Sequence, residues 1–476
     1  MILRLRSIAI LTTCVCYVSL GQAASPIVIK GSKFFDSVTR EQFFIKGVAY
    51  QPRPFGSDFI DPLSRPSDCA RDFAMMHSIG LNTVRVYQVD PFLNHDECMR
   101  ILEDYGMYLL LDLASPRNTI IRTSPEYNID IWNGVRSTVD AFKNFNNVLG
   151  FFIGNEVSND KLTTPASAYV KALLRDTKAY IRQTSPRQIP VGYANNDDPM
   201  IRLQIQAYFN CGNDAERIDF FGINLYEWCG SSTSYATSGY ADRTADVAQY
   251  SVPVFLSEYG CNLVSPRTFP EVQSIYGPDM TGIWSGGVVY EWSQEENNYG
   301  LVRIQGDNSI QTLPDFDHFK DALMAVKPLG VSMDQYNEVG PASACPERTE
   351  FWETSERLPP TPSGATCDCM MSTLSCTAAG LFGSDDQSLG DHLNVICGLV
   401  SCNEIAGNGA QGIYGRYSSC SPIQKLSYIY NKYYHEIGHG EASACYFDGK
   451  AKLVQASRPS DEGCGALMRR RHLPRG

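Results

Sequence analysis

The sequence predicts a (β/α)8 barrel followed by a small, disulfide-rich and mainly helical module. Three observations predict this architecture. Eight apolar, strand-like runs fill a region of about 250 residues, the size of such a barrel. Helical patterns lie between those runs, and eight of the sixteen cysteines crowd the last hundred or so of the 476 residues. Near-continuous apolar runs are typical of parallel strands buried on both faces.

The expected strands are rich in β-branched and aromatic residues. In chain order they span 42–51, 83–89, 108–114, 148–157, 189–195, 218–228, 252–260 and 286–293. Helical patterns at Ser67–Ile79, Thr138–Asn144 and Ala166–Gln183 separate them, with Ser67 as the expected N-cap and Gly80 as the stop of the first helix. The alternative is an open doubly wound sheet. We favour the barrel because no G-x-G-x-x-G turn follows the first strand.

Composition divides the chain into five parts. Residues 1–24 read as a signal peptide, because a basic start precedes an apolar run and small residues; an uncut N-terminal anchor is the alternative. Residues 25–345 form the expected barrel, 346–366 a Pro-rich linker, 367–464 the cysteine-rich module and 465–476 a basic tail. Export together with fourteen cysteines beyond Cys14 and Cys16 predicts disulfides.

The formal net charge of −12 indicates what the protein does not bind. An acidic surface disfavours nucleic acid and anionic membranes as partners. A neutral polymer is compatible with this charge.

Two glutamates follow apolar runs and are the candidate catalytic residues. Glu156 ends the fourth expected strand and Glu258 the seventh. In a barrel the carboxyl ends of all strands meet at the face that carries active sites. Two carboxylates facing each other there suit glycosidic bond cleavage, in which one donates a proton and the other attacks the anomeric carbon or activates water. The alternative for each glutamate is a salt bridge at the rim of the barrel.

The other strand ends supply groups suited to sugars. Asn155, beside Glu156, can bind a sugar 2-hydroxyl. The strand ends also carry Gln51, Tyr87, Asp112, Tyr226 and Tyr290. With Trp228, Trp292 and Tyr299 the tyrosines predict an aromatic-lined groove, and Tyr226 and Tyr290 are expected to orient Glu258. Packing at the barrel rim is the alternative for each tyrosine.

His435–His439 matches the H-E-x-x-H motif of zinc proteases. On a helix it would put both imidazoles on one face, with Glu436 as the base. We interpret it as a solvated loop, because Gly438 and Gly440 weaken a helix there and the surrounding module is too small for a protease cleft.

Six long stretches together resemble the fungal cell-wall β-1,3-glucanosyltransferases of glycoside hydrolase family 72. They lie at 33–52, 81–91, 149–160, 218–230, 253–262 and 288–302, and include GNEV and LSEYGCN. The resemblance implies that Glu156 is the acid/base and Glu258 the nucleophile. It also implies that Gln51, Tyr87, Asp112, Asn155, Tyr226 and Tyr290 lie in the active site.

The last module resembles carbohydrate-binding module family 43. Its implied role is contact with β-1,3-glucan or support of the barrel. The two resemblances together imply the disulfides Cys69–Cys98, Cys211–Cys345, Cys229–Cys261, Cys367–Cys420, Cys369–Cys464, Cys376–Cys445 and Cys397–Cys402. Spacing alone leaves 105 pairings open for the eight cysteines of the module.

The expected function is therefore transfer between β-1,3-glucan chains, one as donor and one as acceptor, by a monomer that needs no metal or organic cofactor. An endo-β-1,3-glucanase and a non-catalytic glucan-binding wall protein are the alternatives. We expect a secreted, wall-associated protein. The family usually ends in a Ser-rich stretch and an apolar tail exchanged for a glycolipid anchor, whereas RRRHLPRG has neither feature. Either the protein is freely secreted, or this C-terminus is truncated or mis-spliced and a full-length form carries the lipid anchor.

Overall fold

The computed structural model describes residues 24–52, 59–115, 118–337, 340–379 and 387–464. Eight parallel strands form a closed barrel, with β10 pairing with β3 to complete the ring. The strands are β3 (Ile45–Ala49), β4 (Thr83–Val86), β5 (Tyr108–Asp112), β6 (Val148–Asn155), β7 (Val191–Asn195), β8 (Phe220–Leu225), β9 (Val254–Tyr259) and β10 (Trp284–Val289). The predicted barrel is confirmed, and several strands are shorter than expected because the apolar runs continue past the last paired residue.

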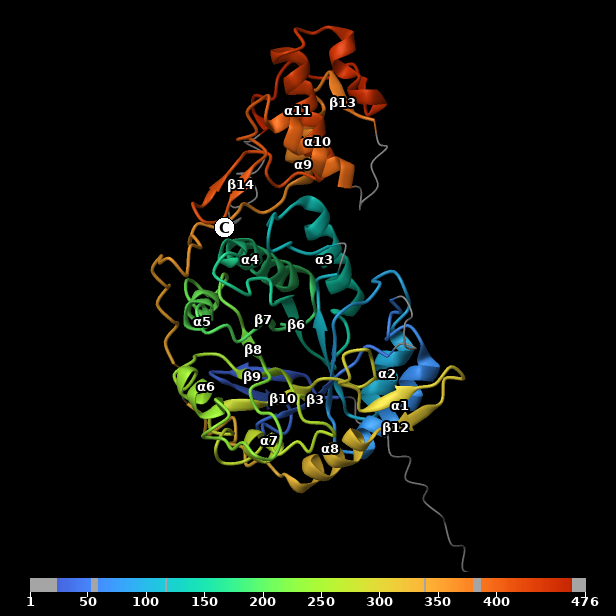
Figure 1. The fold of residues 1–476 in the computed structure, drawn as a ribbon, viewed down its shortest axis with the longest axis vertical. Coiled ribbons are helices and arrows are strands. Elements are labelled where there is room, and N and C mark those ends of the chain that lie inside the picture. Colours follow the sequence, from blue (N-terminus) through green and yellow to red (C-terminus); the bar gives the residue numbers. More distant parts are fainter. Residues whose placement is uncertain (1–23, 53–58, 116–117, 338–339, 380–386, 465–476) are drawn as a thin grey trace, which may run out of the picture.

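Helices cover the outside of the barrel (Figure 1). They are α1 (Pro66–Ser78), α2 (Asp96–Asp104), α3 (Ile129–Phe142), α4 (Ser167–Thr184), α5 (Arg202–Asn210), α6 (Tyr240–Asp246), α7 (Glu271–Ile275) and α8 (Pro314–Ala325), with a 3-10 turn at Thr164–Ala166. Ser67 is not the N-cap of α1, because Pro66 already occupies the first turn and Arg65 precedes it. The helix expected at Thr138 begins at Ile129, since the Asn128 side chain accepts hydrogen bonds from two backbone N–H groups there.

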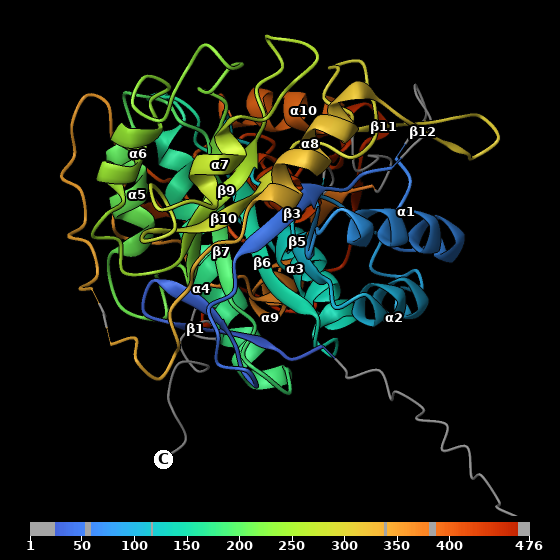
Figure 2. The same cartoon turned by 90° about the horizontal axis from the view of Figure 1, so that it is seen from below.

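An N-terminal hairpin closes the amino-terminal end of the barrel. Its strands are β1 (Ile27–Lys30) and β2 (Lys33–Asp36), and Figure 2 shows β1 beside the lower ends of the barrel strands. Phe34 is fully buried, with its ring 6.2 Å from that of Phe220 and 6.1 Å from that of Phe255. Phe152 packs edge-on against Phe220 at 5.2 Å. Aromatic rings therefore fill the amino-terminal half of the barrel, so a functional site is expected at the opposite, carboxyl end of the strands.

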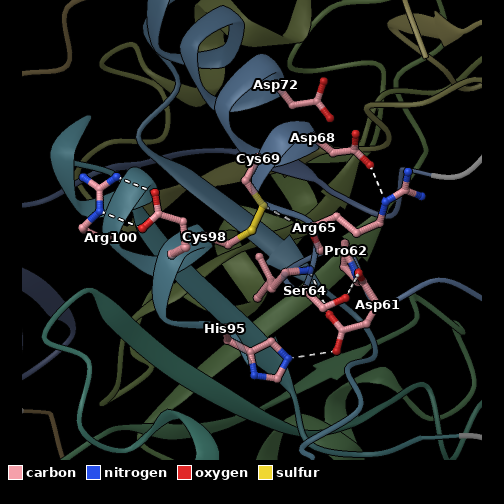
Figure 3. Close-up of a disulfide and its surroundings, with 12 residues drawn as sticks. Asp61, Pro62, Ser64, Arg65, Asp68, Cys69, Asp72, His95, Cys98 and Arg100 are labelled. Atoms are coloured by element: carbon pink, nitrogen blue, oxygen red, sulfur yellow. Dashed lines mark hydrogen bonds and ion pairs between the residues drawn. A yellow bond between two sulfur atoms is a disulfide. The ribbon is translucent and has the colours of Figure 1, made fainter. Parts of the chain in front are cut away.

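Three disulfides fasten the barrel, and they are the pairs that the resemblance implies. Cys69–Cys98 joins α1 to α2 (Figure 3). Beside it, His95 Nε2 lies 2.9 Å from Asp61 Oδ2, and both side chains are buried. Cys229–Cys261 joins the loops after β8 and β9, and Cys211–Cys345 ties the end of α5 to the segment before the linker. Disulfides thus cross-link segments that follow the carboxyl ends of the barrel strands.

The C-terminal module lies at one end of the molecule, next to α3 and α4 (Figure 1). It contains α9 (Gly364–Met371), α10 (Gln387–Cys397) and α11 (Pro422–Glu436), with the short pairs β13 (Cys376–Ala378) with β16 (Ala451–Leu453) and β14 (Gly407–Asn408) with β15 (Ile413–Tyr414). Two further 3-10 turns span Ala442–Cys445 and Phe447–Gly449. Four disulfides cross-link it: Cys367–Cys420, Cys369–Cys464, Cys376–Cys445 and Cys397–Cys402.

The segment between barrel and module packs against the barrel instead of spanning open solvent. Trp352 is fully buried, with its ring 5.3 Å from that of Tyr208. The module itself contacts the loop after β5, where Lys425 Nζ lies 2.5 Å from Glu126 Oε2 and Ile129 N donates to Ser419 O over 2.9 Å. Barrel, linker and module are therefore joined by direct contacts.

Two terminal predictions fall on residues that the structure does not describe. The expected leader, apart from Ala24, and the basic tail 465–476 lie outside the described residues. Within the described part of the chain, none of the helices has the length and apolarity needed to cross a bilayer.

Candidate active site

Glu156 and Glu258 both lie at the carboxyl ends of the barrel strands. Glu156 is the first residue after β6, is half-buried, and its backbone N donates to Ala194 O over 2.9 Å. Its φ of +50° is unusual for a residue with a side chain, and such backbone conformations concentrate at functional sites. Glu258 is the fifth residue of β9 and only 8% exposed. The two carboxylates thus enter the same end of the barrel from strands on different sides.

Three donors hold the carboxylate of Glu258. Tyr87 Oη donates to Oε1 and Tyr226 Oη to Oε2, each over 2.8 Å, and Arg85 Nη1 lies 3.2 Å from Oε1. Burial raises the pKa of Glu258 above its ordinary value, while Arg85 and the two phenols oppose that rise. Burial also raises the pKa of Tyr87 and Tyr226 well above 10.0, so both phenols remain donors. Hydrogen bonds to both oxygens therefore fix the orientation of the Glu258 carboxylate.

Arg85 is a central residue that the sequence analysis missed. Its side chain is fully buried, between the rings of Tyr87 at 4.3 Å and Phe152 at 4.4 Å. Its guanidinium binds both oxygens of Asp112, over 3.2 and 3.0 Å, and Nη2 donates to Asn155 Oδ1 over 2.9 Å. A charge inside the apolar run TVRVYQV was the available signal, because an arginine is rarely buried without partners.

Asn155 and Asn224 connect the two glutamates. Asn224 Nδ2 donates to Glu156 Oε1 over 2.7 Å and lies 3.1 Å from Asn155 Oδ1. The other side of Asn224 is fixed because Ser257 Oγ donates to its Oδ1 over 2.7 Å. Since Asn155 Oδ1 also accepts from Arg85, one continuous hydrogen-bond network runs from Glu156 to Glu258. Asn224, like Arg85, is absent from the sequence-based site because it lies within an apolar strand.

Four tyrosines surround the buried carboxylate. The rings of Tyr87 and Tyr226 each lie 6.4 Å from that of Tyr290, and Tyr299 lies 5.3 Å from Tyr290 and 5.7 Å from Tyr226. All four are half-buried, so each keeps some surface for a ligand. Their edge-to-face geometry is a favourable one for aromatic side chains.

The prediction that Trp228 and Trp292 line the same groove is wrong. Trp228 is 5% exposed and packs edge-on against Tyr240, and Trp292 is fully buried against Phe316. Neither indole can offer a face to a sugar. Each lies three residues beyond a strand end, and the aromatic pattern alone does not tell which way a side chain points.

The remaining predicted residues have less direct positions. Gln51 follows β3, is half-buried, and its carbonyl accepts a hydrogen bond from Ser293 Oγ over 3.1 Å. Asp112, at the end of β5, is 5% exposed with both oxygens bound to Arg85, and burial raises its pKa. Asp112 therefore contributes to the site mainly by fixing Arg85.

The H-E-x-x-H motif does not lie on one helix. Helix α11 ends at Glu436, and His439 follows with a φ of +49°. The two imidazoles therefore do not share a helical face. Across the described ranges, no three His, Cys, Asp or Glu side chains cluster so as to hold a metal ion.

A nucleophilic carboxylate and a second carboxyl group for proton transfer are the groups needed for retaining cleavage of a glycosidic bond. Glu258, with both oxygens oriented, suits the role of the nucleophile. Glu156 is more accessible and suits the role of the group that transfers a proton. The tyrosines around them offer hydroxyls and apolar faces, both of which match a sugar ring.

Comparison with known proteins agrees with this chemistry. Residues 17–327 match the family described as "Glucanosyltransferase" of glycoside hydrolase family 72, and residues 374–452 match the X8 domain. Protein EPD1 of Candida maltosa is 46% identical over 446 residues, 93% of this chain and 80% of that protein. The 1,3-beta-glucanosyltransferase GAS2 of Saccharomyces cerevisiae is 43% identical over 430 residues, 87% of this chain and 77% of that protein.

The fold is also similar to solved structures of Saccharomyces cerevisiae Gas2p. A mutant of Saccharomyces cerevisiae Gas2p in complex with laminaritetraose and laminaripentaose superposes with a TM-score of 0.86 at 40% identity, covering 94% of this chain and 99% of that one. Another Gas2p structure, in complex with laminaritriose and laminaritetraose, has a TM-score of 0.85 at 42% identity.

Proposed function

Because the chain belongs to the glucanosyltransferase family, glycoside hydrolase family 72, we propose that it lengthens β-1,3-glucan by transfer. The enzyme cuts a donor glucan internally and keeps the part with the new reducing end. It then joins that end to the non-reducing end of an acceptor glucan. Both substrates are neutral chains, in keeping with the acidic net charge of the protein.

In the first step Glu258 attacks the anomeric carbon of the donor. Glu156 gives a proton to the departing glycosidic oxygen, so the leaving chain departs as an alcohol and a glycosyl ester forms on Glu258. The phenols of Tyr87 and Tyr226 support this assignment, because they leave the Glu258 carboxylate oriented. Arg85 favours its ionised form.

In the second step Glu156 acts as the base. It takes the proton from an acceptor hydroxyl, whose oxygen attacks the anomeric carbon and releases the carboxylate of Glu258. Two inversions retain the β configuration. This mechanism predicts carboxyl groups about 5–5.5 Å apart, whereas an inverting enzyme would hold them about 6.5–9.5 Å apart.

We assign substrate contacts to the groups that surround the carboxylates. Asn155 binds the 2-hydroxyl beside the reacting carbon, and Tyr87, Tyr226 and Tyr290 present hydroxyls and ring surfaces. Gln51 contributes from the end of β3. Asp112 acts through Arg85, because that guanidinium binds both of its oxygens.

The observation that carries the proposal is the single network that links Glu156 to Glu258 through Asn224, Asn155 and Arg85. The test is incubation with a reduced laminari-oligosaccharide and sizing of the products. Products longer than the starting material are expected. Only shorter products would mean an endo-β-1,3-glucanase.

Replacement of the two glutamates tests their roles separately. Glu258→Gln and Glu156→Gln are each expected to abolish product formation, with Asp279→Asn, outside the site, as the control. Full activity of Glu258→Gln would assign the nucleophile to another residue. A wild-type protein that binds glucan but makes no products would be a non-catalytic wall protein.

The domain division and location are also proposals. We assign the catalytic domain to 25–345, the linker to 346–366 and the carbohydrate-binding module of family 43 to 367–464, around the X8 match. The similarity to proteins named as 1,3-beta-glucanosyltransferases supports our proposal that the protein is secreted to the cell wall. We also propose that it acts as a monomer. Contacts such as Lys425 with Glu126 support a role for the module in bracing the barrel.

A further inference from the structure

Arg267 is a buried arginine outside the set of residues that contact Glu258. It lies in the loop between β9 and α7 and is 3% exposed. Its guanidinium makes four hydrogen bonds. One goes to a carboxylate, since Nε donates to Asp315 Oδ2 over 2.5 Å, and three go to backbone carbonyl oxygens.

The three carbonyls belong to separate segments of the active site. Nη1 donates to Gly260 O over 3.2 Å and to Tyr290 O over 2.6 Å, and Nη2 donates to Tyr299 O over 2.5 Å. Gly260 is two residues beyond Glu258, at the end of β9. Tyr290 follows β10, and Tyr299 lies on the turn before β11 (Val302–Ile304). One planar group therefore joins the end of the Glu258 strand to both tyrosine segments.

The arginine is itself held in place from several directions. Asp315 lies in the first turn of α8, where the helix dipole favours a carboxylate, and its Oδ1 also accepts from the backbone N of Arg267 over 3.2 Å. The guanidinium carbon lies 4.8 Å from the ring centre of Phe269 and 5.6 Å from that of Tyr299. These contacts balance its charge and leave little freedom for its fork of donors.

A second feature shows how closely the side chain approaches the backbone. Gly260 has a φ of +110°, and a Cβ atom at that position would lie 3.1 Å from Arg267 Nη1. The chain therefore passes the guanidinium at a place where a larger residue would push it away.

We propose that Arg267 is a positioning residue for the transfer reaction and holds Tyr290 and Tyr299 in place beside the nucleophile. This inference rests on the proposed function of the site. Tyr290 and Tyr299 are two of the four half-buried rings around Glu258, and an acceptor sugar needs such a surface whereas water does not. Loss of the clamp should therefore weaken transfer more than hydrolysis.

Arg267→Lys tests the proposal. An ammonium group can still pair with Asp315, but it lacks the planar fork that reaches three carbonyls at once. The readout is the ratio of longer, reduced products to shorter products with a free reducing end. Both arise from the same glycosyl-enzyme, so this ratio does not depend on the fraction of folded protein.

We expect the ratio of transfer to hydrolysis to fall roughly threefold or more and kcat about tenfold, since small misplacements of binding groups are costly. Arg175→Lys is the matched control. Arg175 also pairs with a carboxylate, that of Asp176, and donates to a carbonyl oxygen, that of Pro359, but it joins α4 to the linker. The control should keep the wild-type ratio.

An unchanged ratio in Arg267→Lys, with kcat lowered only in proportion to lost folded protein, would overturn the proposal and leave the transferase assignment intact. If Arg267→Lys yields no soluble enzyme, Asp315→Asn preserves the shape and removes the anchoring charge. Its ratio should fall as well, and a wild-type ratio there would count equally against the proposal. A wild-type enzyme that forms no longer products at all would instead refute the proposed function.

Discussion

Glu271 makes the stability of the barrel depend on pH in a direction opposite to that of an ion-paired carboxylate. It is the first residue of α7 and only 3% exposed. Burial raises its pKa from 4.5 to about 7, a rise that a backbone hydrogen bond and Arg267 only partly oppose. The folded protein therefore keeps a proton on this carboxyl group at pH values where the unfolded chain has lost it.

The size of the effect follows from the two pKa values. Below pH 4.5 the carboxyl group of Glu271 is largely protonated in both the folded and the unfolded state, so it does not lower the free energy of unfolding. Between pH 4.5 and about 7 the unfolded state ionises first, so the free energy of unfolding falls as the pH rises. At about 1.36 kcal/mol for each pH unit, the loss amounts to roughly 3 kcal/mol by pH 7.5.

Glu271→Gln removes this titration and retains the shape of the protonated side chain. We expect the variant and the wild type to have similar unfolding free energies at pH 4.5, and the variant to be more stable by roughly 3 kcal/mol at pH 7.5. Urea unfolding with intact disulfides measures both. Tryptophan fluorescence reports on the barrel, because all five tryptophans lie in it or in the linker packed on it.

The exposed Glu296 supplies the control, since Glu296→Gln should shift the unfolding free energy equally at both pH values. A raised pKa of Glu271 would be refuted if the difference in unfolding free energy between wild type and Glu271→Gln changed by less than about 0.5 kcal/mol from pH 4.5 to pH 7.5, because unrelated sites show a spread of that size.

Two further substitutions have clear expected outcomes. Tyr226→Phe removes the donor to Glu258 Oε2, so the pKa of that carboxyl group should rise further, the acidic limb of the kcat/KM profile should move to higher pH, and kcat should fall by roughly 10²-fold; an unshifted profile would contradict the role of the phenol. Gly286→Ala would put a Cβ atom 2.2 Å from Ile45 O at a φ of +92°, where β10 closes the barrel on β3, and should lower stability by at least about 2 kcal/mol in thermal unfolding. Gly282→Ala, whose Cβ would meet no atom within 4 Å, is its control, and equal melting temperatures for the two variants would count against the steric argument.

The barrel and the positions of its two glutamates could be predicted because both depend on local patterns. Apolar runs of strand length mark buried parallel strands, and a carboxylate directly after such a run must lie at the end of the barrel. The strand limits differ from the prediction, since β8 spans only Phe220–Leu225 although the apolar pattern extends to Trp228.

The features that could not be predicted depend on contacts between distant segments. Arg267 and Asp315 are 48 residues apart, and neither stands out within its own stretch of sequence. Lys425 and Glu126, which join the module to the barrel, are 299 residues apart. The burial of Trp292 is a similar case, because periodicity identifies an aromatic residue without telling which neighbour covers it.

The hairpin of β1 and β2 has a consequence for the order of events in catalysis. Phe34 of this hairpin and its aromatic partners fill the amino-terminal end of the barrel, whereas Glu156 and Glu258 lie at the carboxyl ends of the strands. In the proposed transfer reaction, the departing fragment and the incoming acceptor chain therefore both bind at that carboxyl end. The acceptor can then bind only after the departing fragment has dissociated. A fragment that dissociates slowly both shields the glycosyl-enzyme from water and delays binding of the acceptor.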